Sequence, residues 1–125
     1  MDKVLLVEDD LLLREINSDI LQSEGYMVTV AVDGEEALSK IKAGGWDLIL
    51  MDVVIPKING FDVIERAKNE VQLMSPVVFL TNSDDPIDKD RVKVLGGSYV
   101  MKGNITPPEL VALVKKHILA KKTSV

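Results

Sequence analysis

Acidic side chains directly follow two of the apolar runs in this chain. Glu8 and Asp9 come after Val4–Val7, and Asp52 comes after Leu48–Met51. Carboxylates that lie close together repel one another, which raises the pKa of at least one of them unless a cation is bound. Mg²⁺ relieves such repulsion, because it prefers carboxylate oxygens and keeps several of its water ligands. The acidic residues therefore indicate a site for a divalent cation.

A hydroxyl group and an ammonium group follow two further apolar runs. Thr81 comes after Val77–Leu80, and Lys102 comes after Ser98–Met101. Each of these side chains alone is common at a turn or on the surface. Combined with the carboxylates, they form a set suited to a phosphoryl group, with a metal on one side and the lysine and hydroxyl on the other. A carboxylate such as that of Asp52 can itself be the nucleophile and give an aspartyl-phosphate.

Strands and helices are predicted to alternate along the chain and to position these side chains. Strands are expected at Lys3–Val7, Met27–Val32, Leu48–Met51, Val77–Leu80 and Ser98–Met101. Helices are expected after each strand, with Asp33, Asp85 and Thr106 among the residues that begin them. The apolar runs of the first, third and fourth strands do not alternate with polar residues, which is typical of a parallel sheet covered by helices on both faces. Ligands bind beyond the carboxyl ends of such strands, so all the residues singled out are expected at one edge.

Length, charge and composition restrict the class of protein. A chain of 125 residues is long enough for one domain with its own core and too short for two. The net charge of −5 argues against a nucleic-acid surface, which needs clustered Lys and Arg. There is no cysteine, no apolar stretch of the roughly 20 residues that a membrane span needs, and no signal-peptide layout. We expect a soluble cytoplasmic domain over residues 1–120, with 121–125 as a frayed tail.

The motifs resemble the receiver domain of bacterial two-component response regulators, in its single-domain, chemotaxis-regulator-like form. The matching segments are Val7-Glu8-Asp9-Asp10, Asp52 with Pro56 and Asn59-Gly60, Thr81 after its apolar run, and Tyr99 with Lys102. The resemblance covers essentially the whole chain. It implies the flavodoxin-like (βα)5 fold, a five-stranded parallel sheet between five helices, with the strand order 2-1-3-4-5 known for this family.

The resemblance also implies a reaction and a metal. Asp52 would accept a phosphoryl group from the phosphohistidine of a sensor histidine kinase or a phosphotransfer protein. The Mg²⁺ ligands would be Asp9, Asp52 and the backbone carbonyl of Val54, with Glu8 acting through water. Asp10 lies one place beyond the usual acidic pair and is not expected to be a ligand.

The same resemblance implies a switch. Lys102 would pair with a phosphoryl oxygen, Thr81 would move to hydrogen-bond the phosphoryl group, and Tyr99 would rotate inward. The signal would pass to a downstream output protein or domain, or to a homodimer linked to phosphorylation. The domain would not be an enzyme beyond assisting its own phosphotransfer and the slow loss of its phosphoryl group.

Three positions depart from the family pattern. Lys102 is followed by Gly103, where the family usually has proline after a cis peptide bond. A non-proline cis bond costs roughly 3 kcal/mol, so we expect a trans bond and a looser loop. Asn82 follows Thr81 where a small residue is common. Val54 has no polar group to orient an attacking water, so a long-lived phosphoryl group is expected.

Other function classes fit this sequence less well. A Mg²⁺-dependent phosphohydrolase with an Asp nucleophile typically has a second Asp two residues later, where this chain has Val54. A flavin-binding module would need a phosphate loop after the first strand, where Glu8 and Asp9 would repel a phosphate. A degenerate receiver that binds partners without phosphorylation stays open, although the complete set of Asp52, Thr81 and Lys102 speaks against it.

Overall fold

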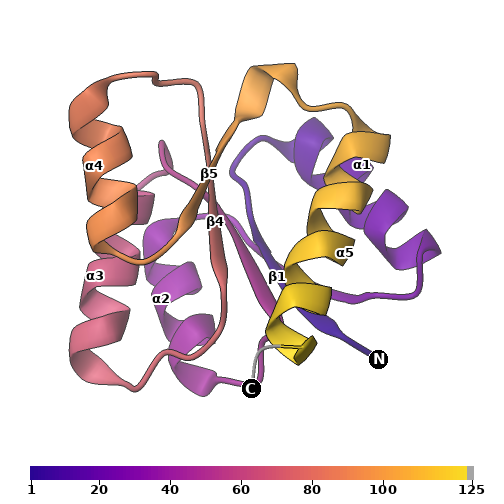
Figure 1. Ribbon diagram of the computed structural model, residues 1–125, viewed down its shortest axis with the longest axis horizontal. Helices are drawn as coiled ribbons and strands as arrows, with labels where there is room; N and C mark the ends of the chain where they lie inside the picture. Colours follow the sequence, from indigo (N-terminus) through magenta and orange to yellow (C-terminus); the bar gives the residue numbers. More distant parts are fainter. Residues whose placement is uncertain (124–125) are drawn as a thin grey trace.

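The computed structural model describes residues 1–123, and these form a single parallel sheet with helices on both faces (Figure 1). The strands are β1 (Lys3–Val7), β2 (Met27–Ala31), β3 (Leu48–Asp52), β4 (Val77–Thr81) and β5 (Ser98–Met101). The helices are α1 (Leu11–Ser23), α2 (Gly34–Ala43), α3 (Gly60–Glu70), α4 (Pro86–Val94) and α5 (Pro107–Thr123), with a short 3-10 turn η1 (Lys102–Asn104). The strand order is β2-β1-β3-β4-β5, as predicted.

Three strands end one residue away from their predicted ends. β2 ends at Ala31 instead of Val32, whereas β3 and β4 include Asp52 and Thr81 as their last residues. The two extensions occur because the backbone is still paired there: Asp52 lies opposite Leu80 in the ladder, and Thr81 lies opposite Met101. Asp52 and Thr81 are therefore held by the sheet itself.

The two faces of the sheet carry separate apolar clusters, because successive strand side chains point to opposite faces. Leu5 and Val7 of β1 pack on the face covered by α2, α3 and α4, whereas Val4 and Leu6 pack on the face covered by α1 and α5. Figure 1 shows these two groups of helices on either side of the strands. The centre of the sheet is thus buried on both faces and forms a rigid base for its edges.

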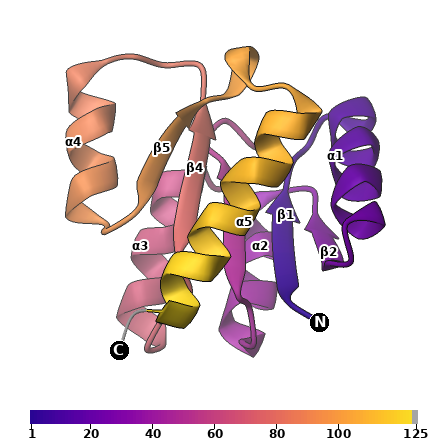
Figure 2. The same cartoon turned by 45° about the vertical axis from the view of Figure 1, so that its right-hand side comes forward.

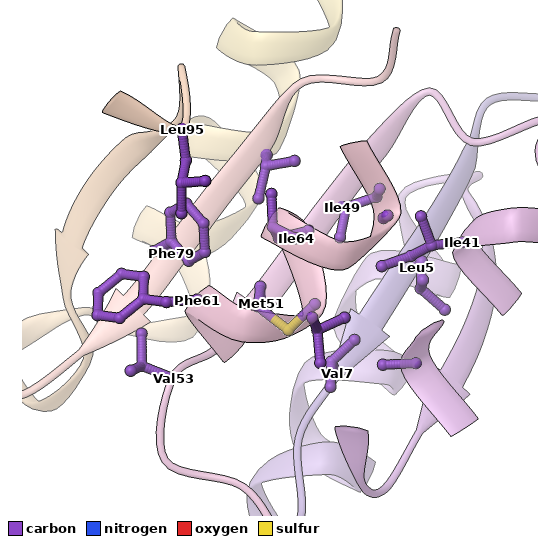
Figure 3. Packing of buried hydrophobic residues seen from close by; sticks show 14 of the residues in the cluster. Leu5, Val7, Ile41, Ile49, Met51, Val53, Phe61, Ile64, Phe79 and Leu95 are labelled. Carbon is purple, nitrogen blue, oxygen red and sulfur yellow. The ribbon is translucent and has the colours of Figure 1, made fainter. Parts of the chain in front are cut away.

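The larger of the two clusters includes aromatic rings and a methionine that pack against β3 and β4. The rings of Phe61 and Phe79 lie 5.1 Å apart between centroids at an interplanar angle of 52° (Figure 3). Met51 and Val53 belong to the same cluster. Since Met51 and Val53 flank Asp52 in the chain, their burial fixes the backbone on both sides of that carboxylate.

Side-chain caps begin the helices, and most of these caps lie at the carboxyl edge of the sheet. Asp10, Asp33, Asn59 and Asp85 each accept a hydrogen bond from a backbone N–H in the first turn of α1, α2, α3 and α4. Thr106 and Glu109 form the predicted capping box before α5. A cap of this kind contributes about 1 kcal/mol and fixes the direction in which the chain leaves the preceding loop.

The last helix runs beyond the predicted domain boundary at residue 120. α5 continues to Thr123, where Lys121 and Lys122 pair with Asp47 and Asp2 at 3.5 and 2.8 Å. Residues 124–125 of the predicted tail lie outside the described residues, and the fraying of the tail stays a prediction. None of the helices within residues 1–123 is long and apolar enough to cross a membrane.

Candidate functional site

The carboxyl ends of the strands bring the predicted residues to one edge of the sheet. In Figure 2 the strand arrows point toward the same end, and turn η1 (orange) lies beyond it. Val7 lies opposite Met51 in the ladder, so Glu8 and Asp52 leave neighbouring strands side by side. Thr81 lies opposite Met101, the residue before Lys102. Side chains from four strand ends therefore face one another across the edge.

Lys102 bridges two buried carboxylates at this edge. Its Nζ donates to Asp52 Oδ2 at 2.7 Å and to the Glu8 carboxylate at 2.9 Å (Oε1) and 3.0 Å (Oε2). Glu8 and Asp52 are only 2% and 3% exposed. Charged groups so far from water must be paired, and the single ammonium serves both carboxylates.

The electrostatics of the site leave it short of positive charge. Burial raises the pKa of Glu8 to about 7, and the neighbouring Asp52 carboxylate adds to this rise. Burial alone would lower the pKa of Lys102, but its hydrogen bonds to Asp52 and Glu8 outweigh that effect and raise the pKa above its ordinary value. Lys102 therefore stays protonated, and its one charge faces the two acids Glu8 and Asp52. A further cation would complete the balance.

Three carboxylates are arranged so that they could bind such a cation. Glu8, Asp9 and Asp52 each offer an oxygen, and these oxygens lie within 4.8 Å of one another. An all-carboxylate set fits a hard cation such as Mg²⁺. The side chain of Asp10 is engaged elsewhere, because Oδ1 accepts the Leu13 N–H at 2.9 Å as the cap of α1. Asp10 is therefore the capping residue of α1, and its absence from the metal ligands stays a prediction.

The segment after Asp52 approaches the strand closely at Gly60. The Gly60 N–H donates to the Val53 carbonyl at 2.9 Å. A Cβ at position 60 would lie 2.5 Å from the backbone oxygen of Asp52 and 2.9 Å from the Met51 side chain. Only glycine fits there, and its absence of a side chain lets α3 begin directly beneath Asp52. Between these residues, Val54 has an exposed side chain, and the role of its carbonyl as a metal ligand stays a prediction.

The backbone of Ser83 joins the two predicted switch residues. Thr81 is buried, and its Oγ1 accepts the Ser83 N–H at 3.1 Å. The Tyr99 hydroxyl donates to the carbonyl of Ser83. Tyr99 is partly buried against the cluster below α4. The sequence indicated Thr81 and Tyr99 but not this link, which depends on how the loop after β4 folds back over β5.

The loop after β5 contains a second contact that the sequence did not indicate. The bond between Lys102 and Gly103 is trans, as predicted, and no peptide bond within residues 1–123 is cis. The Gly103 N–H donates to Asn82 Oδ1 at 2.7 Å. Two of the positions that depart from the family pattern are thus hydrogen-bonded to each other.

Comparison with known families matches most of the chain to one family model. The family model of the response regulator receiver domain matches residues 4–115. The chain belongs to this family. The matched range of the receiver domain includes every predicted site residue from Glu8 to Lys102.

Two curated relatives of this receiver domain are transcriptional regulatory proteins. The domain is 33% identical over 114 residues to CrdR of Helicobacter pylori, covering 91% of this chain and 54% of that protein. It is 36% identical over 113 residues to the alkaline phosphatase synthesis regulator PhoP of Bacillus subtilis, covering 90% and 47%. The chain thus spans about half the length of these relatives.

Solved structures share the fold over their whole length. The chemotaxis protein CheY4 of Vibrio cholerae is 32% identical with a TM-score of 0.83, covering 93% of this chain and 98% of that one. A CheY-like receiver domain from Methanospirillum hungatei has a TM-score of 0.91 at 24% identity, covering 100% and 99%, which is a likeness of fold alone.

Proposed function

We propose that this receiver domain accepts a phosphoryl group from a phosphohistidine onto Asp52 and changes conformation in response. The observation that carries the proposal is the buried Asp52 carboxylate, which lies 2.7 Å from the Lys102 ammonium and beside two further carboxylates. A nucleophile in this setting is oriented before the donor arrives, and most of the work in phosphoryl transfer is positioning and charge neutralisation.

In the proposed reaction an Asp52 carboxylate oxygen attacks the phosphorus in line with the leaving nitrogen. The new P–O bond forms as the P–N bond of the donor breaks, and its electron pair goes to the imidazole ring, which is released as neutral histidine after taking up a proton. Lys102 then exchanges part of its contact with Asp52 for a phosphoryl oxygen. Mg²⁺ held by Asp9, Asp52 and the Val54 carbonyl, with Glu8 through water, would neutralise charge on the phosphoryl oxygens.

The proposed switch starts from the contacts of Ser83. In this proposal the Thr81 hydroxyl moves toward the phosphoryl group to donate to it, and so leaves the Ser83 N–H from which it now accepts. The Ser83 backbone then loses this anchor on its N–H side, which frees its carbonyl, the acceptor of the Tyr99 hydroxyl, to move. Tyr99 can rotate toward the space that Thr81 leaves. A local charge change thereby selects between two arrangements of the loop after β4.

The proposed function implies two kinds of partner, one that donates the phosphoryl group and one that receives the signal. The donor is a sensor histidine kinase or a phosphotransfer protein, and Leu11 and Leu12, exposed beside the acidic edge, provide an apolar contact for it. The signal passes to an output protein or domain, or to a second copy of the chain on phosphorylation. No turnover of a further substrate is proposed.

Mass spectrometry after incubation with Mg²⁺ and a small phosphodonor such as acetyl phosphate tests this function. The wild type is expected to gain one phosphoryl group, and Asp52→Asn is expected to gain none. Asp10→Asn is the matched control, because Asp10 caps α1 and should leave labelling intact. Equal labelling of Asp52→Asn would reject the assignment. A wild type that takes up no phosphoryl group would favour a degenerate receiver.

A further inference from the structure

Asn82 and Gly103 connect the two loops that border the site. Asn82 directly follows Thr81 at the end of β4, and Gly103 directly follows Lys102 at the end of β5. The Gly103 N–H donates to Asn82 Oδ1 at 2.7 Å across 21 residues of sequence. The two residues that act on the phosphoryl group in the proposed function are therefore each one residue away from the same hydrogen bond.

The bond gives the exposed Gly103 N–H an acceptor within the protein. Gly103 lies in turn η1, whose preceding residue Met101 provides no side-chain cap. The first N–H groups of a helical turn have no acceptor within the turn itself. Asn82 supplies that acceptor from the neighbouring loop, so it acts as a remote cap for the turn that begins at Lys102.

Proline at position 103 or alanine at position 82 would each abolish this contact. Proline at position 103 would have no N–H to donate. A Cβ at position 103 would lie 3.0 Å from Asn82 Oδ1, which is a tight contact, so glycine leaves the room that the amide needs. Replacing Asn82 by alanine would remove the acceptor. The hydrogen bond therefore depends on the side chain of Asn82 and the backbone of Gly103 together.

We propose that Asn82 is a positioning residue that orients Lys102 through the Gly103 backbone. Lys102 is the only link between turn η1 and the carboxylates of Asp52 and Glu8 among the hydrogen bonds of residues 1–123. Fixing the backbone at residue 103 limits the directions in which its side chain can leave the turn. The same bond ties the side chain of Asn82, the residue after Thr81, to the backbone of Gly103, the residue after Lys102, so that Thr81 and Lys102 approach the phosphoryl group together. This inference rests on the proposed function for its effect on rate.

Three measurements on Asn82→Ala test the proposal, with Asn104→Ala as the matched control. Asn104 is an exposed amide in the same turn, and its side chain makes no hydrogen bond within residues 1–123. By NMR without phosphodonor, Asn82→Ala is expected to speed hydrogen exchange of the Gly103 amide and of the Lys102 ammonium by about 3- to 10-fold, the effect of losing one hydrogen bond. With acetyl phosphate and saturating Mg²⁺, the maximal phosphorylation rate is expected to fall by a similar factor. Asn104→Ala should change none of the three.

Two further variants separate positioning from a general loss of structure. Asn82→Asp keeps a carbonyl-type acceptor and is expected to restore protection of the Gly103 amide. Gly103→Pro removes the donor, so adding Asn82→Ala to it should have no further effect on rate. Faster exchange of Gly103 with an unchanged Lys102 signal and an unchanged rate would overturn the proposal. If the wild type accepts no phosphoryl group, the proposed function fails, and the Lys102 signal alone decides whether Asn82 positions the lysine.

Discussion

Lys102 Nζ lies 2.7 Å from Asp52 Oδ2, with both side chains largely removed from water. Because Glu8 pairs with the same ammonium, removing the lysine affects two carboxylates, whereas removing the Asp52 carboxylate affects only one ion pair. Lys102→Met would leave two buried acids without a counter-charge, whereas Asp52→Asn would leave one acid paired with the lysine. We expect the first to lower the free energy of unfolding by about 2 kcal/mol, part of the loss being offset by protonation of Glu8, and the second to change it by less than about 1 kcal/mol. Urea unfolding in EDTA measures both, and equal losses would contradict the shared pairing.

A divalent cation is expected to stabilise the fold through Asp9. Binding to the folded state at about 100 times the dissociation constant adds about 2.7 kcal/mol to the free energy of unfolding. Asp9→Asn should abolish this gain, because Asp9 offers one of the three clustered oxygens. Asp10→Asn should keep it, because asparagine caps a helix as well as aspartate. The melting temperatures of both variants are measured with and without Mg²⁺. If Mg²⁺ no longer raised the melting temperature of Asp10→Asn, the cation would bind elsewhere.

The close approach at Gly60 predicts a defect in function beyond a loss of stability. Gly60→Ala would force a Cβ against the backbone oxygen of Asp52, at a cost of about 3 kcal/mol, and would displace the carboxylate. Gly25→Ala is a useful comparison, because position 25 has open space and a φ of +91°, so only the backbone strain of about 1 kcal/mol applies. Phosphorylation rates measured well below each melting temperature should fall for Gly60→Ala and stay at the wild-type value for Gly25→Ala.

Val54 predicts a slow loss of the phosphoryl group. Its side chain is 78% exposed beside Asp52 and offers nothing that could orient a water molecule. Val54→Asn adds a polar group at this position, and we expect it to speed dephosphorylation by about 10-fold. Val54→Ala shortens the side chain without adding polarity and should leave the lifetime unchanged. Decay of the phosphoryl group followed by mass spectrometry distinguishes them, and a wild-type half-life of only seconds would refute the expectation.

Asp47 predicts a pH-dependent contribution to stability at the opposite edge of the sheet. Its Oδ2 accepts the Lys3 N–H at 2.8 Å, and this hydrogen bond lowers the pKa of Asp47 below its ordinary value. Because the folded pKa is the lower one, the contribution is fully present above the unfolded pKa of about 3.9 and is lost as the pH falls through the folded value.

Asp47→Asn keeps the acceptor but removes the charge. We expect it to lower the free energy of unfolding by about 1 kcal/mol at neutral pH, the surplus of a charged over a neutral hydrogen bond. The gap from the wild type should begin to narrow below about pH 5, where the unfolded state starts to be protonated, and should close as the pH falls through the lowered pKa of folded Asp47. Urea unfolding across this range measures the gap, and a constant gap would show that the charge of Asp47 is not the cause.

Local sequence patterns predicted the elements well where the interactions that form them are local. The caps at Asp33, Asp85 and Thr106 each bond a backbone group within three residues, so their effect is visible in a short stretch of sequence. The ends of β3 and β4 were placed one residue early, because Asp52 and Thr81 belong to strands only through pairing with a neighbouring strand.

The sequence by itself determined which side chains meet at the site. In a parallel sheet the carboxyl ends of all strands lie at one edge, so residues that follow apolar runs, such as Glu8, Asp52 and Lys102, are brought together by topology alone. Only the tertiary structure decided how they are connected: one ammonium shared by two acids, the Ser83 backbone between Thr81 and Tyr99, and the bond from Gly103 to Asn82. These contacts depend on the path of two loops relative to each other, and that path is fixed by the packing of the helices that follow them.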